Sequence, residues 1–414
     1  MATNSINTVK SLTGIAAKMG AVMLRNRLGF TASIDKEDES TFGGAFKSVQ
    51  PGDTIYVNKN ARYAVRSNAT FSTQDTVEER VALTVNQRRG VDIDLTSAEI
   101  ATDAQLKSWA SRFLAPAVSR IADEVESYNL TQATQASYMT VGTPGTSPAT
   151  SGVFLQAAER IRAQSCPQDN LMAVIHQSVN TTMIPALQGL FLPNTQVSNQ
   201  FKTGYLGSTT LGMDFMTSNL AYTHTNGTAV SQSVLINGAV STNGAATLAV
   251  DAITGTNTLT KGTTFTIAGV FDVNPITKAT LPNLKQFTVT ATTAATAGAI
   301  AALPISPALY FTGTRQNVST TIADNAALVF TTGATAGSVL ANSLVYHPSA
   351  VRFCSVPLFD PGKGVVECST ETVDGISMRA IKFYDGDTDQ LKMRLDIQFG
   401  TAVVRDEWMC RVTS

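Results

Sequence analysis

Residues that build catalytic and metal sites are scarce in this sequence. Its three histidines, His176, His224 and His347, lie far apart, and no HExxH or nucleophile motif occurs near them. No GxxxxGK[ST] motif is present, and no GxGxxG motif lies between a strand and a helix. We therefore expect structural histidines, no catalytic residue, no cofactor, and a protein that is not an enzyme.

Cysteine is equally sparse. The four cysteines, Cys166, Cys354, Cys368 and Cys410, are scattered and form no CxxC pair. This argues against a zinc site and a disulfide framework, and favours reduced thiols in a cytoplasm.

One acidic cluster imitates the spacing of a calcium loop. Its members are Asp385, Asp387, Asp389 and Asp396. Gln390 takes the place of the required glycine, and a strand pattern follows instead of a helix. An Asp-rich turn is the simpler interpretation, so we expect no bound metal.

Long apolar runs and an excess of one charge are also missing. No run is long enough to span a membrane, and the net charge of -1 implies no strong attraction to nucleic acid or to a membrane. The stretch from Ile15 to Leu24 is apolar apart from Lys18, and no small-residue cleavage site follows it. We expect an amphipathic arm helix rather than a signal peptide, in a segment that has no strand partner of its own and is free to lie on another molecule.

One helical pattern is longer and clearer than any other. From Trp109 to Asn129 the apolar residues recur at the three-four spacing of one helix face. The opposite, polar face carries Arg112, Arg120, Asp123, Glu124 and Glu126. Pro116 leaves two alternatives open, because the helix either begins there or kinks there.

A strand-like period precedes this helix. Residues 54–65 are rich in β-branched and aromatic residues, and apolar residues alternate from Val81 to Leu95. Polar residues 67–80 lie between them, so we expect a long two-stranded hairpin with these residues at its tip. Such a hairpin is marginally stable by itself and needs a surface to lie on.

The predicted hairpin carries many charges of both signs. A solvated face is one interpretation, since exposed ion pairs contribute little, and pairing with a neighbouring subunit is the other. The candidate interface residues are Lys59, Arg62, Arg66, Asp75, Glu78, Glu79, Arg80, Arg88, Arg89 and Asp92.

After the long helix, predicted helices and strands alternate. A helix is expected over 154–163 with Ser151 as its cap, then a strand over 171–176, then a helix capped by Ser178 that runs towards Leu190. This alternation indicates a compact α/β lobe.

Charge almost disappears from residues 222–344. Only seven of these 123 residues are charged, against 61 in the whole chain of 414. Short β-branched runs separated by Gly, Pro and Asn predict an all-β barrel or sandwich. Because 345–356 resume the earlier pattern, this module is predicted to be an insertion. Residues 361–414 return to charged, alternating strands, the last of which Gly400 is expected to break.

Segments from several parts of the chain resemble one known family. They are KGTTFTIAGV at 261–270 with VNP at 273–275 and LKQFTV at 284–289, LAPA and RIAD in the long helix, LGMDF at 211–215, and MRLD and FG at 393–400. Each is weakly specific alone, but their order covers nearly the whole chain. The sequence therefore resembles tailed-bacteriophage major capsid proteins of the P-twenty-two type, which have the Hong Kong ninety-seven capsid fold and an inserted β-domain.

The resemblance implies an α+β capsid fold with a spine helix and an inserted all-β barrel. Its segments are an N-terminal arm at 1–42, an extended loop at 43–95, a peripheral domain at 96–150, an axial domain at 151–221, the inserted domain at 222–344, the returning axial domain at 345–360, and C-terminal peripheral strands at 361–414.

The resemblance also implies partners. We expect hexamers and pentamers of an icosahedral shell in the virion, assembled in the host bacterial cytoplasm with a scaffolding protein and a portal protein. A decoration protein is left open. The enclosed double-stranded DNA is expected to be bound weakly and non-specifically, because the net charge is near zero. The alternative is a β-rich adhesin or fibre protein that binds a receptor or glycan, which predicts β structure throughout.

Overall fold

The computed structural model describes residues 17–18, 20–24, 28–36, 54–59, 62–63, 65, 69–71, 73, 78–96, 113–187, 211–359 and 367–414. They belong to two compact units, which we treat separately. Unit 1 falls within Met1–Val57, Ala82–Asn129 and Arg352–Ala402, and unit 2 within Asn58–Val81, Leu130–Val351 and Val403–Ser414.

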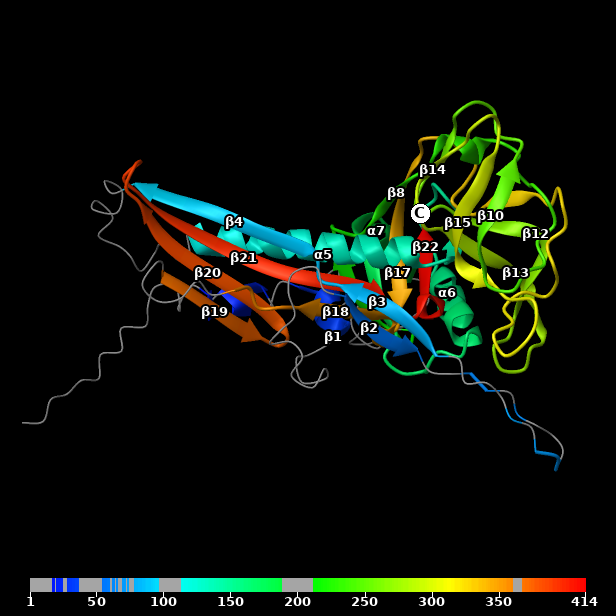
Figure 1. Ribbon diagram of the computed structural model, residues 1–414, viewed down its shortest axis with the longest axis horizontal. Coiled ribbons are helices and arrows are strands. Elements are labelled where there is room, and N and C mark those ends of the chain that lie inside the picture. The colour runs from blue at the N-terminus through cyan, green and yellow to red at the C-terminus, as the bar shows by residue number, and fades with distance from the viewer. Residues whose placement is uncertain are drawn as a thin grey trace, which may run out of the picture. The chain divides into compact units, whose positions relative to one another are not determined.

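Unit 1 is built on a six-stranded sheet. Its order is β1 (Asp35–Lys36), β18 (Val351–Ser355), β21 (Gln390–Val403), β20 (Ile376–Asp385) and β19 (Glu367–Val373), and β4 (Gln87–Thr96) also pairs with β21. Figure 1 shows the long strands β4, β21 and β20 running side by side, with helix α5 along them. The edge of the Tyr128 ring packs on Phe399 at 5.6 Å between centroids, which fixes the helix against the sheet.

The predicted hairpin is only partly correct. Strands β2 (Thr54–Lys59) and β3 (Glu79–Thr84) do form a two-stranded sheet. β4, which we expected in the hairpin, instead pairs antiparallel with β21, where Val91 lies opposite Leu395 and Ile93 opposite Met393. This pairing brings the alternating apolar residues of β4 against apolar partners on β21.

Strand β21 passes through Gly400 without a break, contrary to our expectation. A Cβ atom at this position would collide with the carbonyl oxygen of Thr84. Glycine therefore permits a close approach of two backbones here and does not end the strand.

Helix α5 (Ala115–Ala136) resolves the alternatives at Pro116. The α-helix begins at Ala115, after a short π-helical turn at 113–114, so the proline lies in its first turn. The helix continues seven residues beyond the predicted end at Asn129. Residues 109–112 of the predicted helix lie outside the described part of the chain.

The arm has partners within its own chain. Ala17, Ala21 and Leu24 are buried, and β1 pairs parallel with β18, so the expectation of a segment without strand partners is wrong for Asp35 and Lys36. Short helix α2 (Phe30–Ser33) precedes this strand.

Glu126 corrects the predicted polar face of the long helix. Its side chain is buried. Its carboxylate accepts hydrogen bonds from the backbone N–H groups of Gly29, Phe30 and Thr31, and from the hydroxyl of Thr31. Burial raises the pKa of Glu126, although these donors oppose the shift. The carboxylate thus takes up N–H groups at the start of α2 that the helix itself cannot satisfy.

Unit 2 contains the predicted α/β lobe. Its sheet has the order β5 (Met139–Gly142), β22 (Met409–Thr413), β17 (Val339–Tyr346), β6 (Met172–His176) and β7 (Asp214–Ser218), and β8 (Thr223–Thr225) also pairs with β17. Helix α6 (Gly152–Ala163) buries Phe154 and Ile161 in a core shared with Ile175 and Val345. Helix α7 (Gln177–Leu187) follows β6 directly.

The cap predicted at Ser151 is correct in position only, and the cap predicted at Ser178 is wrong. Ser151 occupies the cap position of α6 without a side-chain hydrogen bond. Ser178 lies inside α7, where its backbone N–H donates to Nδ1 of His176 at 3.2 Å. The histidine therefore supplies the capping acceptor, which agrees with the structural role expected for it.

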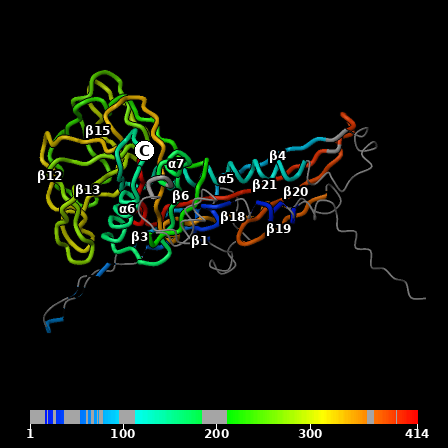
Figure 2. The backbone as a smooth tube through the Cα atoms, turned by 180° about the vertical axis from the view of Figure 1, so that it is seen from behind, coloured from blue at the N-terminus to red at the C-terminus, as the bar shows by residue number. Residues whose placement is uncertain are grey.

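Between β8 and β17 the described chain is all-β apart from a short 3-10 turn at Thr228–Ser231. The main sheet has the order β16 (Leu328–Phe330), β12 (Thr264–Val273), β13 (Thr280–Val289), β15 (Ile300–Leu309), β10 (Ala245–Asp251) and β9 (Leu235–Ile236), and a second sheet pairs β11 (Thr258–Leu259) with β14 (Thr293–Ala294). A bridge between Leu235 and Ala327 brings the two edges of the main sheet together. Figure 2 shows the backbone of these strands curving round, and their buried side chains form one hydrophobic core. This nearly closed sheet is partly consistent with the predicted barrel.

Strand β17 connects the barrel to the lobe. Its first part pairs with β8, and its last residues pair with β22 and β6. The strand therefore runs across the expected domain boundary between residues 344 and 345. Among the described residues, no helix combines the length and apolarity that crossing a membrane requires.

Candidate intersubunit surface

The candidate interface residues divide between the two units. In unit 2, Nζ of Lys59 lies 4.0 Å from Glu79, whose carboxylate also lies 2.7 Å from the guanidinium of Arg315 in the barrel. Arg62 lies 3.4 Å from Glu407. Glu78 and Arg80 are exposed. The remaining two candidates of this segment, Arg66 and Asp75, lie outside the described residues.

The other three candidates lie on β4 in unit 1. Arg88 lies 2.6 Å from Asp396, a buried carboxylate that Arg379 also contacts at 2.7 Å. Asp92 accepts two hydrogen bonds from Arg394, at 2.8 and 3.0 Å. These bonds hold the pKa of Asp92 below its usual value.

Arg89 is placed differently. Its guanidinium carbon lies 5.8 Å from the centre of the Tyr128 ring, a cation–π contact. Five candidates thus form ion pairs inside their own chain, with partners distant in the sequence. From the sequence we considered a solvated charged face and pairing with a neighbouring subunit. Ion pairs within the same chain are a third arrangement, which we did not consider.

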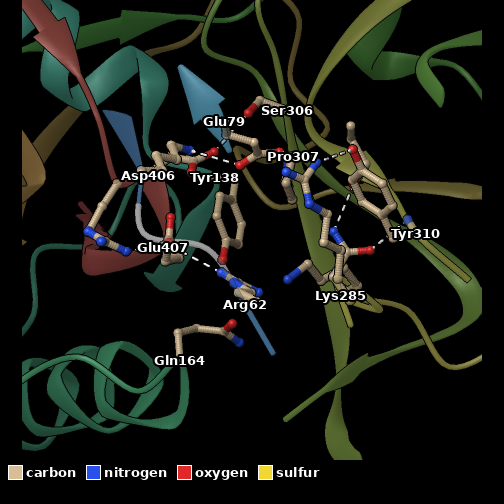
Figure 3. A pocket seen from close by; sticks show the side chains of 15 residues that line it. Arg62, Glu79, Tyr138, Gln164, Lys285, Ser306, Pro307, Tyr310, Asp406 and Glu407 are labelled. Atoms are coloured by element: carbon tan, nitrogen blue, oxygen red, sulfur yellow. Dashed lines mark hydrogen bonds and ion pairs between the residues drawn. The ribbon is translucent and has the colours of Figure 1, made fainter. Parts of the chain in front are cut away.

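A polar cavity in unit 2 brings three of the candidates together. Its volume is about 190 Å³, and its lining residues are Lys59, Arg62, Glu79, Tyr138, Gln164, Lys285, Ser306, Pro307, Ala308, Tyr310, Arg315, Asn317, Arg405, Asp406 and Glu407. Figure 3 shows the side chains of Arg62 and Glu407 meeting in it, with Lys285 and Tyr310 from the barrel beside them.

Glu407 is the carboxylate of this cavity whose acid–base equilibrium is shifted upward. Burial, together with the adjacent negative charge of Asp406, raises its pKa to about 7. The hydroxyl of Ser306 donates a 2.8 Å hydrogen bond to Asp406. At neutral pH Glu407 therefore exists as a mixture of its protonated and ionised forms.

Arg411 was not expected from the sequence. Its guanidinium is completely buried. It donates to the carbonyl oxygens of Ser137, Gln135 and Gly262 and to the hydroxyl of Thr288. Burial lowers its pKa to about 10. Arg411 thus links strand β22 and the end of α5 to the barrel through hydrogen bonds. No local sequence motif predicts this role.

The acidic cluster at Asp385 forms a turn. Its carboxylate accepts hydrogen bonds from Lys392 at 2.5 Å, Thr388 at 2.9 Å and the backbone N–H of Asp387 at 3.1 Å. The bond from Lys392, followed by the other two, lowers the pKa of Asp385 to about 2. These bonds support the interpretation of an Asp-rich turn. Within the part of the chain that the structure describes, no three His, Cys, Asp or Glu residues are grouped to hold a metal.

The family model described as "P22 coat protein - gene protein 5" matches residues 44–410. No curated protein matches the sequence.

Among solved structures, one from Mycobacterium phage Che8 has 10% sequence identity, covers 93% of this chain and 90% of its own, and gives a TM-score of 0.46. The capsid of Ralstonia phage GP4 has 8% identity, covers 88% and 84%, and gives 0.45. The capsid of cyanophage P-SCSP1u has 10% identity, covers 88% and 84%, and gives 0.41.

Proposed function

We propose, from the premise that this chain belongs to the P22 coat protein family, that its copies assemble as hexamers and pentamers into an icosahedral shell around double-stranded DNA. The protein is a major capsid protein and a virion component, because the family match spans residues 44–410 of 414. That match is the observation that carries the proposal. The helices α5, α6 and α7 disagree with the alternative of an adhesin with β structure throughout.

The hairpin segment, residues 54–84, supplies a contact between subunits in this proposal. Four of its large apolar side chains are exposed: Tyr56, Tyr63, Val65 and Phe71. Within the described residues, β2 and β3 form a sheet of two strands, and in the proposal their outer edges are where a strand of a neighbouring subunit pairs. A neighbouring subunit that covers this segment would bury these side chains and pair with these edges.

The charged candidates have two roles in the proposal. Glu78 and Arg80 are exposed and contribute to the contact itself. Lys59, Arg62 and Glu79 orient the segment through the ion pairs described above.

The proposal also covers the place of assembly, the partner proteins and the enclosed DNA. Assembly takes place in the host bacterial cytoplasm with a scaffolding protein and a portal protein, and a decoration protein is an optional further partner. DNA is enclosed without strong binding, because the net charge of -1 provides little attraction to phosphates. The protein acts as a structural subunit and not as an enzyme.

The direct test is cryo-electron microscopy of the purified full-length protein, expressed alone and with the neighbouring phage genes. We expect closed icosahedral particles or capsomer rings. A homogeneous monomer or trimer under both conditions would contradict the proposal.

The contact is tested by Phe71→Ser combined with Val65→Ser. We expect unchanged circular dichroism of the subunit and fewer shells. The matched control is Ile276→Ser, which removes an exposed apolar side chain from the barrel. Equal shell yields for the double variant and the wild type would exclude the segment as a contact.

A further inference from the structure

The cavity in unit 2 holds more positive than negative charge. Five basic side chains line it, those of Lys59, Arg62, Lys285, Arg315 and Arg405, against three acidic ones, those of Glu79, Asp406 and Glu407. Lys285 is balanced from outside this set by Asp272, 3.0 Å away. The remaining four basic side chains face three acidic ones. When Glu407 is protonated, only two acidic side chains remain ionised against these four.

This excess of positive charge lies in a cavity whose basic side chains are partly buried. The side chains of Arg405, Lys59 and Arg315 are only 19%, 22% and 24% exposed. Concentrating like charges away from water is unfavourable unless a counter-charge accompanies them. The basic groups therefore favour an additional anion beside the two carboxylates that they share.

The arginine side chains in the cavity have the capacity to bind an additional anion. Each guanidinium carries five N–H donors in a planar fork that suits oxyanions. Glu79 receives Lys59 and Arg315, whereas Glu407 receives Arg62 and Arg405 at 3.4 and 3.7 Å, which are long ion pairs. A volume of about 190 Å³ holds roughly six water molecules, which is room enough for a tetrahedral oxyanion.

We propose that this cavity binds a small inorganic oxyanion such as sulfate or phosphate, held by Arg62, Arg315 and Arg405. The anion takes the place of water and makes charge-assisted hydrogen bonds with the guanidinium groups. Ionised Glu407 opposes it, because it repels the anion and occupies two of the same arginines. Binding is therefore accompanied by uptake of a proton at Glu407.

The surroundings of Glu407 set this coupling. The charged and titratable groups around it are Asp406 and Arg405 on its own turn, Arg62, Lys59 and Glu79 on the hairpin segment, Arg315, Lys285, Asp272 and Tyr310 on the barrel, Tyr138 before β5, and Arg162 and Cys166 at the end of α6. Because its pKa is about 7, this group titrates in the middle of the range from pH 6 to 8.

The test is calorimetric titration of the full-length subunit with sodium sulfate, against sodium chloride at equal ionic strength. We expect saturable binding of sulfate at pH 6.5. Arg62→Gln and Arg315→Gln should each weaken it about ten- to a hundredfold, because each removes charge-assisted hydrogen bonds. Arg120→Gln, which removes an exposed arginine paired with Glu124, should leave the affinity unchanged.

The pH dependence gives a second readout, because sulfate keeps its charge between pH 6 and 8. The affinity of the wild type should fall about tenfold over this range, as the protonated fraction of Glu407 falls. Glu407→Gln should abolish this change and bind more tightly than the wild type at pH 8. If Arg62→Gln or Arg315→Gln fails to fold by circular dichroism, Arg405→Gln takes its place in the sulfate titration.

Three results would overturn the proposal. One is sulfate binding no stronger than that of chloride. Another is wild-type affinity in the folded arginine variants. The third is displacement of sulfate by a short oligothymidylate, which would assign the site to a nucleic-acid backbone and not to a free ion.

Discussion

The barrel and the hairpin segment are both β structure, but the barrel buries most of its large apolar side chains and the hairpin segment exposes several of its own. The barrel nearly closes its sheet through the bridge between Leu235 and Ala327, and buries phenylalanines such as Phe265 and Phe287 completely. The hairpin segment has two strands and leaves Phe71 82% exposed. The barrel therefore buries most of its apolar side chains within one chain, whereas the described part of the hairpin segment leaves four of its large apolar side chains exposed.

The largest effect is expected from a change inside the barrel. Phe287 is fully buried and stacks on Phe265, with 5.7 Å between the ring centres. Phe287→Ala should lower the free energy of unfolding by about 3–5 kcal/mol, because it removes apolar contacts and leaves a cavity. Urea unfolding followed by circular dichroism measures the loss. Phe71→Ala is the matched control, with a change within about 0.5 kcal/mol, and equal losses in both variants would refute the comparison.

A second variant separates the barrel's own stability from its attachment to the lobe. Arg411→Met keeps an apolar stem but leaves the carbonyl oxygens of Ser137 and Gly262 without their donor. We expect a loss of about 3 kcal/mol, because buried polar groups become unsatisfied. Chemical denaturation measures it, and Arg120→Met at an exposed ion pair is the control. A loss below about 1 kcal/mol would show that the barrel is held to the lobe mainly by other contacts.

The third prediction concerns pH and the attachment of the hairpin segment. The pKa of Glu407 is raised from 4.5 to about 7 in the folded protein. Between these values the native state binds more protons than the unfolded state, so this group makes the protein less stable as the pH rises. The effect is at most about 3 kcal/mol. Unfolding free energies measured from pH 5 to 8 should lose this component in Glu407→Gln, and an unchanged slope would contradict the assignment.

The smallest effect is expected at an exposed ion pair of unit 1. Asp92→Asn removes the pair with Arg394 and should lower stability by less than about 1 kcal/mol, because solvent screens both charges. The pKa of Asp92 is lowered in the folded state. Its contribution is therefore present above pH 3.8 and disappears as the pH falls through the lowered folded value. Urea unfolding at pH 7 and pH 3 checks this, and a larger difference between wild type and variant at pH 3 would contradict it.

Local patterns predicted much of the fold. The three-four spacing from Trp109 to Asn129 predicted most of α5, and the short β-branched runs between residues 222 and 344 predicted an all-β barrel or sandwich. Both features depend on neighbours in the sequence, since helical periodicity and strand composition are local properties. The partner of β4 could not be predicted in the same way, because an alternating strand fits any sheet that offers an apolar face.

The candidate residues show the same division. The sequence identified Lys59, Arg62 and Glu79 as charged positions of one segment, but Arg315 and Glu407 come from distant parts of the chain. The cavity that they share exists only after folding.

The sequence by itself determined the helix, the barrel and, through the ordered family segments, the capsid fold. Tertiary structure decided which charges became buried. Glu126 belongs to the polar face by its spacing, yet the arm covers it and supplies N–H donors. Arg411 lies in an alternating strand, yet carbonyl oxygens of α5 and the barrel enclose it. The physical reason is that the energy of a charge depends on the groups that surround it after folding, and these come from segments far apart in the chain.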